Sequence, residues 1–238
     1  MSKQKNRLLA AMLAVQDHSQ VAILSSFFKT GTGQYGEGDL FLGIKVPTTR
    51  KVVKSLSGQM SFDELEECIA SKYHEVRLAA LLALIDIYKR AGKDVAFKKA
   101  CVDFYLAHTA QINNWDLVDL SCYELLGDWL LDKDRLILHE LAKNGKTIWE
   151  QRIGIVSTMK FVRNGQIDDT LSIAELLLDS PHDLIHKAVG WLLREVGKRN
   201  CVALVSFLNA HLRRMPRTTL RYAIERFPED ERKMWLAK

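Results

Sequence analysis

Residues 113–119, with the sequence NNWDLVD, combine a large aromatic ring and a carboxylate at a spacing that could support chemistry. Asn113 or Asn114 can cap a helix by accepting a hydrogen bond from a backbone N–H, so we predict that a helix begins here. Trp115 and Asp119 are then four positions apart and lie on the same stripe of that helix. A stripe that faces a core should be apolar. Asp119 is therefore either a buried structural hydrogen-bonding group or a charge that faces a cleft and is used there.

The composition is that of an ordinary globular protein that can bury a sizeable core, with 238 residues, 47% hydrophobic and 26% charged. The four cysteines are far apart in the sequence and form no C-x-x-C pair, which favours a reducing, cytoplasmic setting. No apolar run approaches the roughly 20 residues of a membrane-spanning helix. We therefore expect no membrane association. The seven histidines show no metal-binding spacing such as H-E-x-x-H, so we expect no metal site either.

The formal net charge of +5 favours a polyanionic partner such as nucleic acid. The basic residues gather in the last third of the chain, where few acids lie between them. A solvated basic face without a nucleic-acid partner is the alternative interpretation. The basic residues concerned are Arg194, Lys198, Arg199, Arg213, Arg214, Arg217, Arg221 and Arg226.

Apolar residues recur at helical spacing along nearly the whole chain, and no run alternates as a strand would. The clearest case is residues 74–90, where apolar side chains wrap most of the predicted helix, as expected for an element packed on several sides. The four prolines lie between such patterns, where a proline can begin or precede a helix. The predicted fold class is therefore all-α.

Three segments resemble one another: EVRLAA from residue 75, EQRIGI from residue 150 and HKAVGW from residue 186. Residues 113–119 fill the gap between the first two. A repeat of roughly 40 residues with two helices per unit indicates a HEAT-type solenoid, an α-α superhelix whose second helices line a concave face. We therefore predict one HEAT-like repeat domain over residues 1–238. Its concave basic face would carry Trp115, Asp119, Arg152 and Trp191.

Residues 30–39, with the sequence TGTGQYGEGD, interrupt the helical pattern and are predicted to form a mobile loop at the mouth of a cleft. They also match the dinucleotide fingerprint G-x-G-x-x-G. That fingerprint requires a strand before it and a helix directly after it. Neither is indicated here, so we expect no nucleotide cofactor.

Four separated motifs resemble the signatures of the AlkD-type DNA alkylation repair family. They are residues 41–47 (FLGIKVP) followed by Arg50, residues 115–119 (WDLVD), residues 148–152 (IWEQR) and residues 187–195 (KAVGWLLRE). The similarity extends over nearly the whole chain, and the motifs stand in the family's order. The resemblance implies a fold of HEAT-like repeats, in agreement with the periodicity. It also implies a monofunctional DNA glycosylase of base excision repair, which releases N3- and N7-alkylated purines without a metal or an organic cofactor.

The same resemblance assigns roles to individual residues. Asp119 corresponds to the catalytic carboxylate, and Trp115 and Trp191 to aromatic walls beside the deoxyribose of the lesion. Arg152 corresponds to a phosphate-binding residue, and Tyr35 in the glycine-rich loop to a further aromatic contact with DNA. Additional candidate phosphate contacts are Arg50, Arg194, Lys198 and Arg199.

These residue types suit the implied reaction. An N3- or N7-alkylated purine already carries positive charge and leaves with little or no protonation, so the barrier lies in the oxocarbenium charge that develops on the sugar. A fixed carboxylate stabilises that charge and can orient the attacking water. Tryptophan faces attract a cation by about 0.5–2 kcal/mol each. An arginine can hold a backbone phosphate through two parallel hydrogen bonds and thereby fix the register of the sugar.

Each assignment has a structural alternative. Trp115 and Trp191 could be core residues, and Asp119 could form a structural ion pair with Arg152. Asp116, early in its helix, is interpreted as a charge favoured by the helix dipole rather than as a catalyst. Trp149 is predicted to pack between helices, and Trp129 and Trp235 are predicted to serve packing and C-terminal capping.

Two other protein classes remain as alternatives to the glycosylase. One is a non-catalytic DNA-binding repeat protein that recognises structured or damaged DNA, and the other is a HEAT scaffold that binds proteins. A strong decrease of DNA affinity with salt would favour either DNA-binding class over the scaffold. Turnover alone separates the first two. We expect a monomer that acts on double-stranded DNA.

Overall fold

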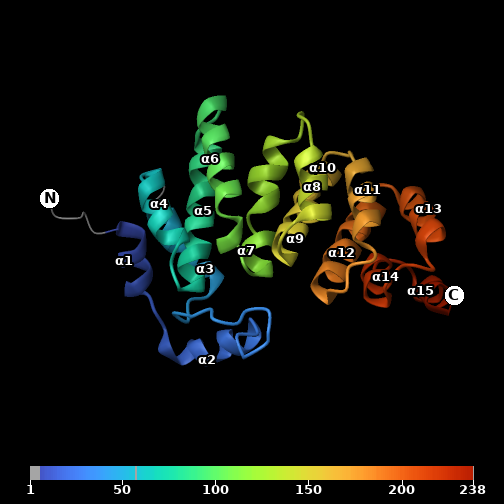
Figure 1. The fold of residues 1–238 in the computed structure, drawn as a ribbon, viewed down its shortest axis with the longest axis horizontal. Coiled ribbons are helices and arrows are strands. Elements are labelled where there is room, and N and C mark those ends of the chain that lie inside the picture. The colour runs from blue at the N-terminus through green and yellow to red at the C-terminus, as the bar shows by residue number, and fades with distance from the viewer. Residues whose placement is uncertain (1–5, 57, 238) are drawn as a thin grey trace. The chain divides into compact units, whose positions relative to one another are not determined.

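The structure is a computed structural model that describes residues 6–56 and 58–237. It confirms the all-α fold (Figure 1): within these ranges one helix follows another, and the only β-type pairing is an isolated bridge between Leu40 and Tyr73. The helices are α1 (Arg7–Ala14), α2 (His18–Phe27), α3 (Val46–Ser55), α4 (Phe62–Ile69), α5 (His74–Arg90), α6 (Val95–Ala107), α7 (Trp115–Asp119), α8 (Leu136–Asn144), α9 (Ile148–Ser157), α10 (Met159–Arg163), α11 (Asp168–Leu177), α12 (Asp183–Arg199), α13 (Cys201–His211), α14 (Arg217–Ala223) and α15 (Glu229–Ala237), with a 3-10 turn η1 (Thr109–Gln111) and a π-helical turn η2 (Tyr123–Gly127).

The chain divides into two compact units, Met1–Ser121 and Cys122–Lys238, and each is described by itself. In the first unit α5 is the central element, because α1, α3, α4, α6 and α7 all pack against it. Of the 17 residues of α5, 14 are buried. This confirms the prediction that residues 74–90 form a helix packed on several sides.

In the second unit, neighbouring helices form pairs that pack on one another. α8 packs against α9, α11 packs against α12, and α9 and α12 also contact each other. Such contacts between successive pairs are typical of helical repeats. Two glycines permit the close approach: a Cβ at Gly154 would lie 2.7 Å from the carbonyl oxygen of Leu138 in α8, and a Cβ at Gly190 would lie 2.6 Å from that of Thr219 in α14.

The helix starts follow the sequence signals. Asp17, Asp94 and Thr147 cap α2, α6 and α9 by accepting a hydrogen bond from a first-turn N–H, and Ser61 forms a capping box at the start of α4. Pro47 lies in the first turn of α3, where its missing N–H costs nothing. These local preferences explain why so many short helices begin at defined residues.

Two of the remaining tryptophans serve packing, as predicted. Trp149 and Trp235 are buried, and the half-buried ring of Trp129 lies 4.3 Å from the ammonium group of Lys133. In the described part of the chain no single helix is long and apolar enough to cross a membrane, and α1 with α2 satisfies that criterion only as a pair bent by 103°.

Candidate active site

The short helix α7 carries the predicted carboxylate and the first predicted aromatic wall. Asn114 is the N-cap, because its side-chain oxygen accepts a hydrogen bond of 2.9 Å from the backbone N–H of Trp115. The helix ends one turn later at Asp119. Trp115 and Asp119 therefore project from one side of α7, as the spacing predicted.

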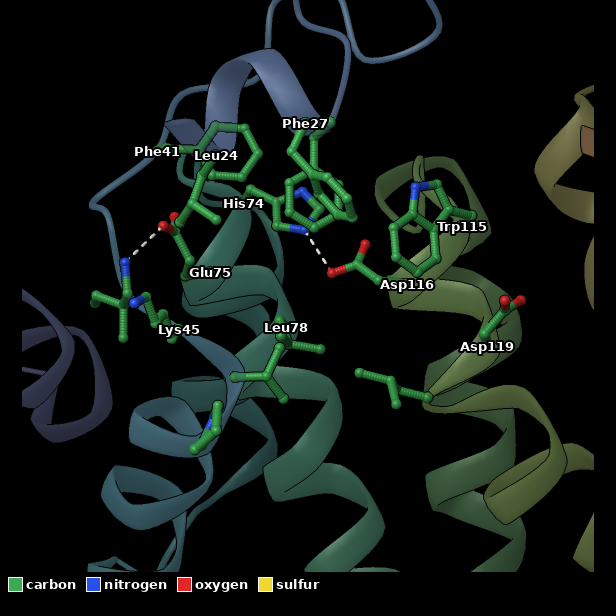
Figure 2. A pocket seen from close by; sticks show the side chains of 15 residues that line it. Leu24, Phe27, Phe41, Lys45, His74, Glu75, Leu78, Trp115, Asp116 and Asp119 are labelled. Atoms are coloured by element: carbon green, nitrogen blue, oxygen red, sulfur yellow. Dashed lines mark hydrogen bonds and ion pairs between the residues drawn. The ribbon is translucent and has the colours of Figure 1, made fainter. Parts of the chain in front are cut away.

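Trp115 and Asp119 line one pocket of about 380 Å³ in the first unit (Figure 2). Both residues are half-buried, so Asp119 keeps partial access to solvent instead of lying within a solid core. Residues of α2, α3, α5 and α7 and of the segment before α3 form the walls. Most of the lining side chains are aliphatic or aromatic: Leu24, Phe27, Phe28, Phe41, Ile44, Val46, Pro47, Leu78 and Leu120.

An aromatic cluster holds the indole of Trp115 in place. The Trp115 ring stacks on Phe28 with 5.4 Å between centroids and meets Phe27 edge-on at 5.8 Å. Phe28 in turn stacks on Phe41 at 5.3 Å. Aromatic pairs at these separations stabilise by about 0.5–1.5 kcal/mol beyond the area they bury. Trp115 thus has a packing role and a place in the pocket wall at the same time.

His74, at the start of α5, lies between two buried carboxylates. Its Nδ1 is 3.1 Å from Asp39 and its Nε2 is 2.9 Å from Asp116. Both ring nitrogens can donate only in the imidazolium form. Burial by itself lowers the pKa of His74, but the hydrogen bonds to Asp116 and Asp39 outweigh burial and raise this pKa to about 9. The ring also contacts Phe28 and Phe41, at 4.7 and 4.8 Å between centroids.

Arg77 completes this group of buried charges. Its guanidinium donates to Asp39 at 2.7 Å, to the side chain of Asn113 at 3.0 Å and to the carbonyl of Ser71 at 2.9 Å. Burial opposes the ionisation of Asp39, but the contacts with His74, Arg77 and Asn113 together lower the pKa of its carboxyl group. Two acids and two cations therefore balance in the interior, which is the condition for tolerating buried charge.

Glu75 fixes the segment that precedes α3. Its carboxylate accepts hydrogen bonds from three consecutive backbone N–H groups, those of Leu42, Gly43 and Ile44, at 2.9 to 3.1 Å. Gly43 has a φ of +81°, and a Cβ there would lie 1.9 Å from the carbonyl oxygen of Asp17. The glycine of the FLGIKVP motif is therefore required by the backbone conformation and by the close approach of a neighbouring chain segment.

Most of these partners are not predicted from the sequence. The prediction for Asp116 is only a charge near a helix N-terminus. Asp116 does lie in the first turn of α7, but it is buried and its carboxylate binds His74. A signal was present: His74, Glu75 and Arg77 are polar residues in the first turn of a helix whose next eight residues are all apolar, and buried polar groups need partners.

The glycine-rich loop contributes Asp39 to the buried charges and no residue to the pocket lining. Within the loop, the Gly33 N–H donates to Glu37 at 2.8 Å, and Gly36 packs so closely that a Cβ would lie 2.4 Å from the carbonyl oxygen of Phe28. Tyr35 is half-buried within the loop. Its role as a DNA contact stays a prediction.

Two predicted site residues lie in the second unit and one predicted phosphate contact lies in the first. Arg152 in α9 is buried, and its guanidinium donates to the carbonyl of Leu184. Trp191 is half-buried on α12. Arg50 is exposed on α3. The roles assigned to all three stay predictions.

The predicted phosphate contacts near the end of α12 differ in exposure. Arg194 is half-buried and pairs with Glu225 and, at 3.8 Å, with Glu195. Lys198 is exposed and pairs with Glu195 at 2.6 Å, whereas Arg199 is exposed at the last residue of the helix. A polyanion can reach the exposed side chains of Lys198 and Arg199. To bind a phosphate, Arg194 would have to exchange one of its two glutamate partners for it.

Known proteins similar to this chain indicate its family and its fold. A family model described as DNA alkylation repair enzyme matches residues 8–227. No curated protein matches the chain. Among solved structures, a predicted DNA alkylation repair enzyme from Enterococcus faecalis is similar, with 19% identity, a TM-score of 0.66 and coverage of 90% of this chain and 97% of that chain. At this level of identity, the likeness shows the fold.

Proposed function

Because the chain belongs to the DNA alkylation repair enzyme family, we propose that it is a monofunctional DNA glycosylase for N3- and N7-alkylated purines in double-stranded DNA. One observation carries the proposal: Asp119 and Trp115 share the lining of a pocket that is otherwise largely apolar. At the edge of such a pocket, the carboxylate of Asp119 can stabilise positive charge that develops nearby.

The chemistry then follows from the charge of the lesion. The alkylated base is already cationic, so it leaves with the electron pair of the glycosidic bond and becomes neutral. Positive charge appears on the sugar, where the carboxylate of Asp119 stabilises it and the face of Trp115 adds a weaker attraction. Water attacks the anomeric carbon and loses a proton to Asp119 or to solvent, which completes hydrolysis.

We propose that residues of both units supply the remaining DNA contacts. Trp191 would form the second aromatic wall, and Arg152 would bind a phosphate beside the lesion. Arg152 donates to the carbonyl of Leu184, but a guanidinium carries five N–H donors and can serve more than one acceptor. Further contacts with the DNA backbone are assigned to Tyr35, Arg50, Arg194, Lys198 and Arg199.

The test is release of 7-methylguanine and 3-methyladenine from methylated duplex DNA in the presence of EDTA. We expect release by the wild type and a loss of about 10²–10³-fold in the single-turnover rate for Asp119→Asn, with DNA affinity retained. Asp86→Asn is the matched control, because it makes the same chemical change at a surface pair with Arg90 on α5. Absence of release by the wild type, combined with salt-dependent DNA binding, would instead support a non-catalytic DNA-binding protein.

A further inference from the structure

Helix α7 depends on its neighbours for its position. It has only five residues, and a single helical turn is not stable by itself in water. Polar side chains connect its start to the rest of the first unit: Asp116 in the first turn binds His74, and Asn113, just before the N-cap, binds both Asp39 and Arg77. Buried polar contacts therefore help to place the two pocket residues on α7, beside the packing of the fully buried side chains of Leu117 and Val118.

We propose that His74 is a positioning residue of the active site, which through Asp116 holds α7 so that Asp119 and Trp115 keep their places in the pocket. Its consequence for catalysis rests on the proposed function. Figure 2 shows the arrangement: Asp116 points toward the His74 ring, and Trp115 and Asp119 lie on the same helix.

A second set of contacts connects His74 to the site. The His74 ring contacts Phe28 at 4.7 Å between centroids, and Phe28 stacks on the indole of Trp115 at 5.4 Å. A displacement of the His74 ring therefore affects Trp115 through Phe28 and affects α7 through Asp116. A residue that merely filled space in the core would make the first kind of contact without the second.

The charge of His74 is essential to this role. If the ring loses a proton, one of its nitrogens becomes an acceptor and faces a carboxylate, so two lone pairs oppose each other at hydrogen-bond distance. Either Asp39 in the loop or Asp116 in α7 must then move away. The other charged group that acts on His74 is Arg77 on its own helix, which lowers its pKa. Three further charged residues line the same pocket: Lys45, Glu75 and Asp119.

The variant Asp116→Asn tests the proposal with little change in shape. Its amide oxygen can still accept the hydrogen bond from His74, but the negative charge that helps to hold the proton is gone. Two quantities are measured between pH 6 and 9.5: the single-turnover rate of base release from prebound DNA, and the NMR signal of the Trp115 indole N–H, assigned with Trp115→Phe. The His74 ring signal is followed in the same samples and is assigned by its disappearance in His74→Gln.

In the wild type we expect the rate to fall and the Trp115 signal to shift as the pH rises, both with a midpoint near pH 9, the pKa of His74. In Asp116→Asn both midpoints should move to lower pH by at least about one unit, which corresponds to loss of one charged partner. At pH 8 the rate should fall by about 10–100-fold with unchanged DNA affinity. Asp86→Asn on α5 serves as the charge-matched control and should behave as the wild type.

Identical pH profiles in the wild type and Asp116→Asn would overturn the proposal. So would a loss of DNA affinity that accounts for the whole decrease in rate. If the wild type releases no base, the proposed function fails, and the NMR signals decide the positioning role by themselves. A Trp115 indole signal that shifts with the same midpoint as the His74 ring signal would then support the positioning role. A Trp115 signal that does not respond to the titration of His74 would overturn it.

Discussion

Helices α7 and α12 carry the two predicted aromatic walls, but different interactions fix them in their units. The five residues of α7 are held by apolar packing and, in addition, by buried charge, through the contact between Asp116 and His74. The 17 residues of α12 are held by close packing, since Gly190 brings it against Thr219 of α14. The first arrangement depends on the protonation of one side chain. The second depends on the absence of a side chain at Gly190.

The largest expected effect is on α7. Replacing His74 by leucine leaves Asp116 and Asp39 buried without one of their cations. Loss of one partner of a buried ion pair costs about 3–5 kcal/mol of unfolding free energy. The measurement is urea-induced unfolding at pH 6.5, followed by circular dichroism. A cost below about 1 kcal/mol would contradict the view that buried charge holds this region together.

The second prediction concerns pH and leaves the sequence unchanged. The pKa of His74 is raised from 6.5 in the unfolded chain to about 9 in the folded protein. Its contribution is therefore fully present below about pH 6.5 and is lost as the pH rises through 9, a change of about 3 kcal/mol. The pKa of Asp39 is lowered, so its effect on stability has the opposite pH dependence. Its contribution to the unfolding free energy is present above the ordinary pKa of an aspartate and is lost in acid. Unfolding curves between pH 2 and 9.5 check both limbs, because the contribution of Asp39 is lost only below the ordinary pKa of 3.8. Constant stability above pH 6.5 would contradict the assignment of His74.

A third prediction concerns α12. Gly190→Ala places a methyl group within 2.6 Å of the carbonyl oxygen of Thr219 and should cost about 1–3 kcal/mol of unfolding free energy. Because no titrating group is introduced, this cost should be the same at pH 6.5 and pH 9. Lys187→Ala on the same helix is the control, and its surface pair with Asp183 contributes at most about 1 kcal/mol. A cost for Gly190→Ala that varied with pH would remove the contrast between the two helices.

The smallest effect on stability is expected at the exposed end of α12. Lys198→Ala removes a surface pair with Glu195 and should change the unfolding free energy by less than about 1 kcal/mol. If Lys198 contacts a phosphate, the slope of log affinity for DNA against log salt should fall by about one. Lys99→Ala is the matched control, since Lys99 forms a similar exposed pair with Asp103 on α6. Equal slopes for the two variants would contradict the assignment of Lys198 as a DNA contact.

Much of this architecture could be predicted from local sequence patterns. Helical periodicity predicted the all-α class and the bounds of α5, and the spacing of Trp115 and Asp119 predicted that they share one side of a helix. The buried charges could not be predicted in this way. Asp39 and His74 are 35 positions apart, and His74 and Asp116 are 42 apart. Periodicity indicates which face of a helix is polar, but it does not indicate which distant polar group will meet that face.

The bonds from Glu75 to residues 42–44 have a consequence for hydrogen exchange. These three amides lie outside any helix, and one carboxylate on α5 accepts from all of them. Their protection against deuterium therefore depends on docking of the segment before α3, instead of on local helix fraying. We expect the three amides to exchange at one common rate. That rate would report directly on how often the segment before α3 separates from α5.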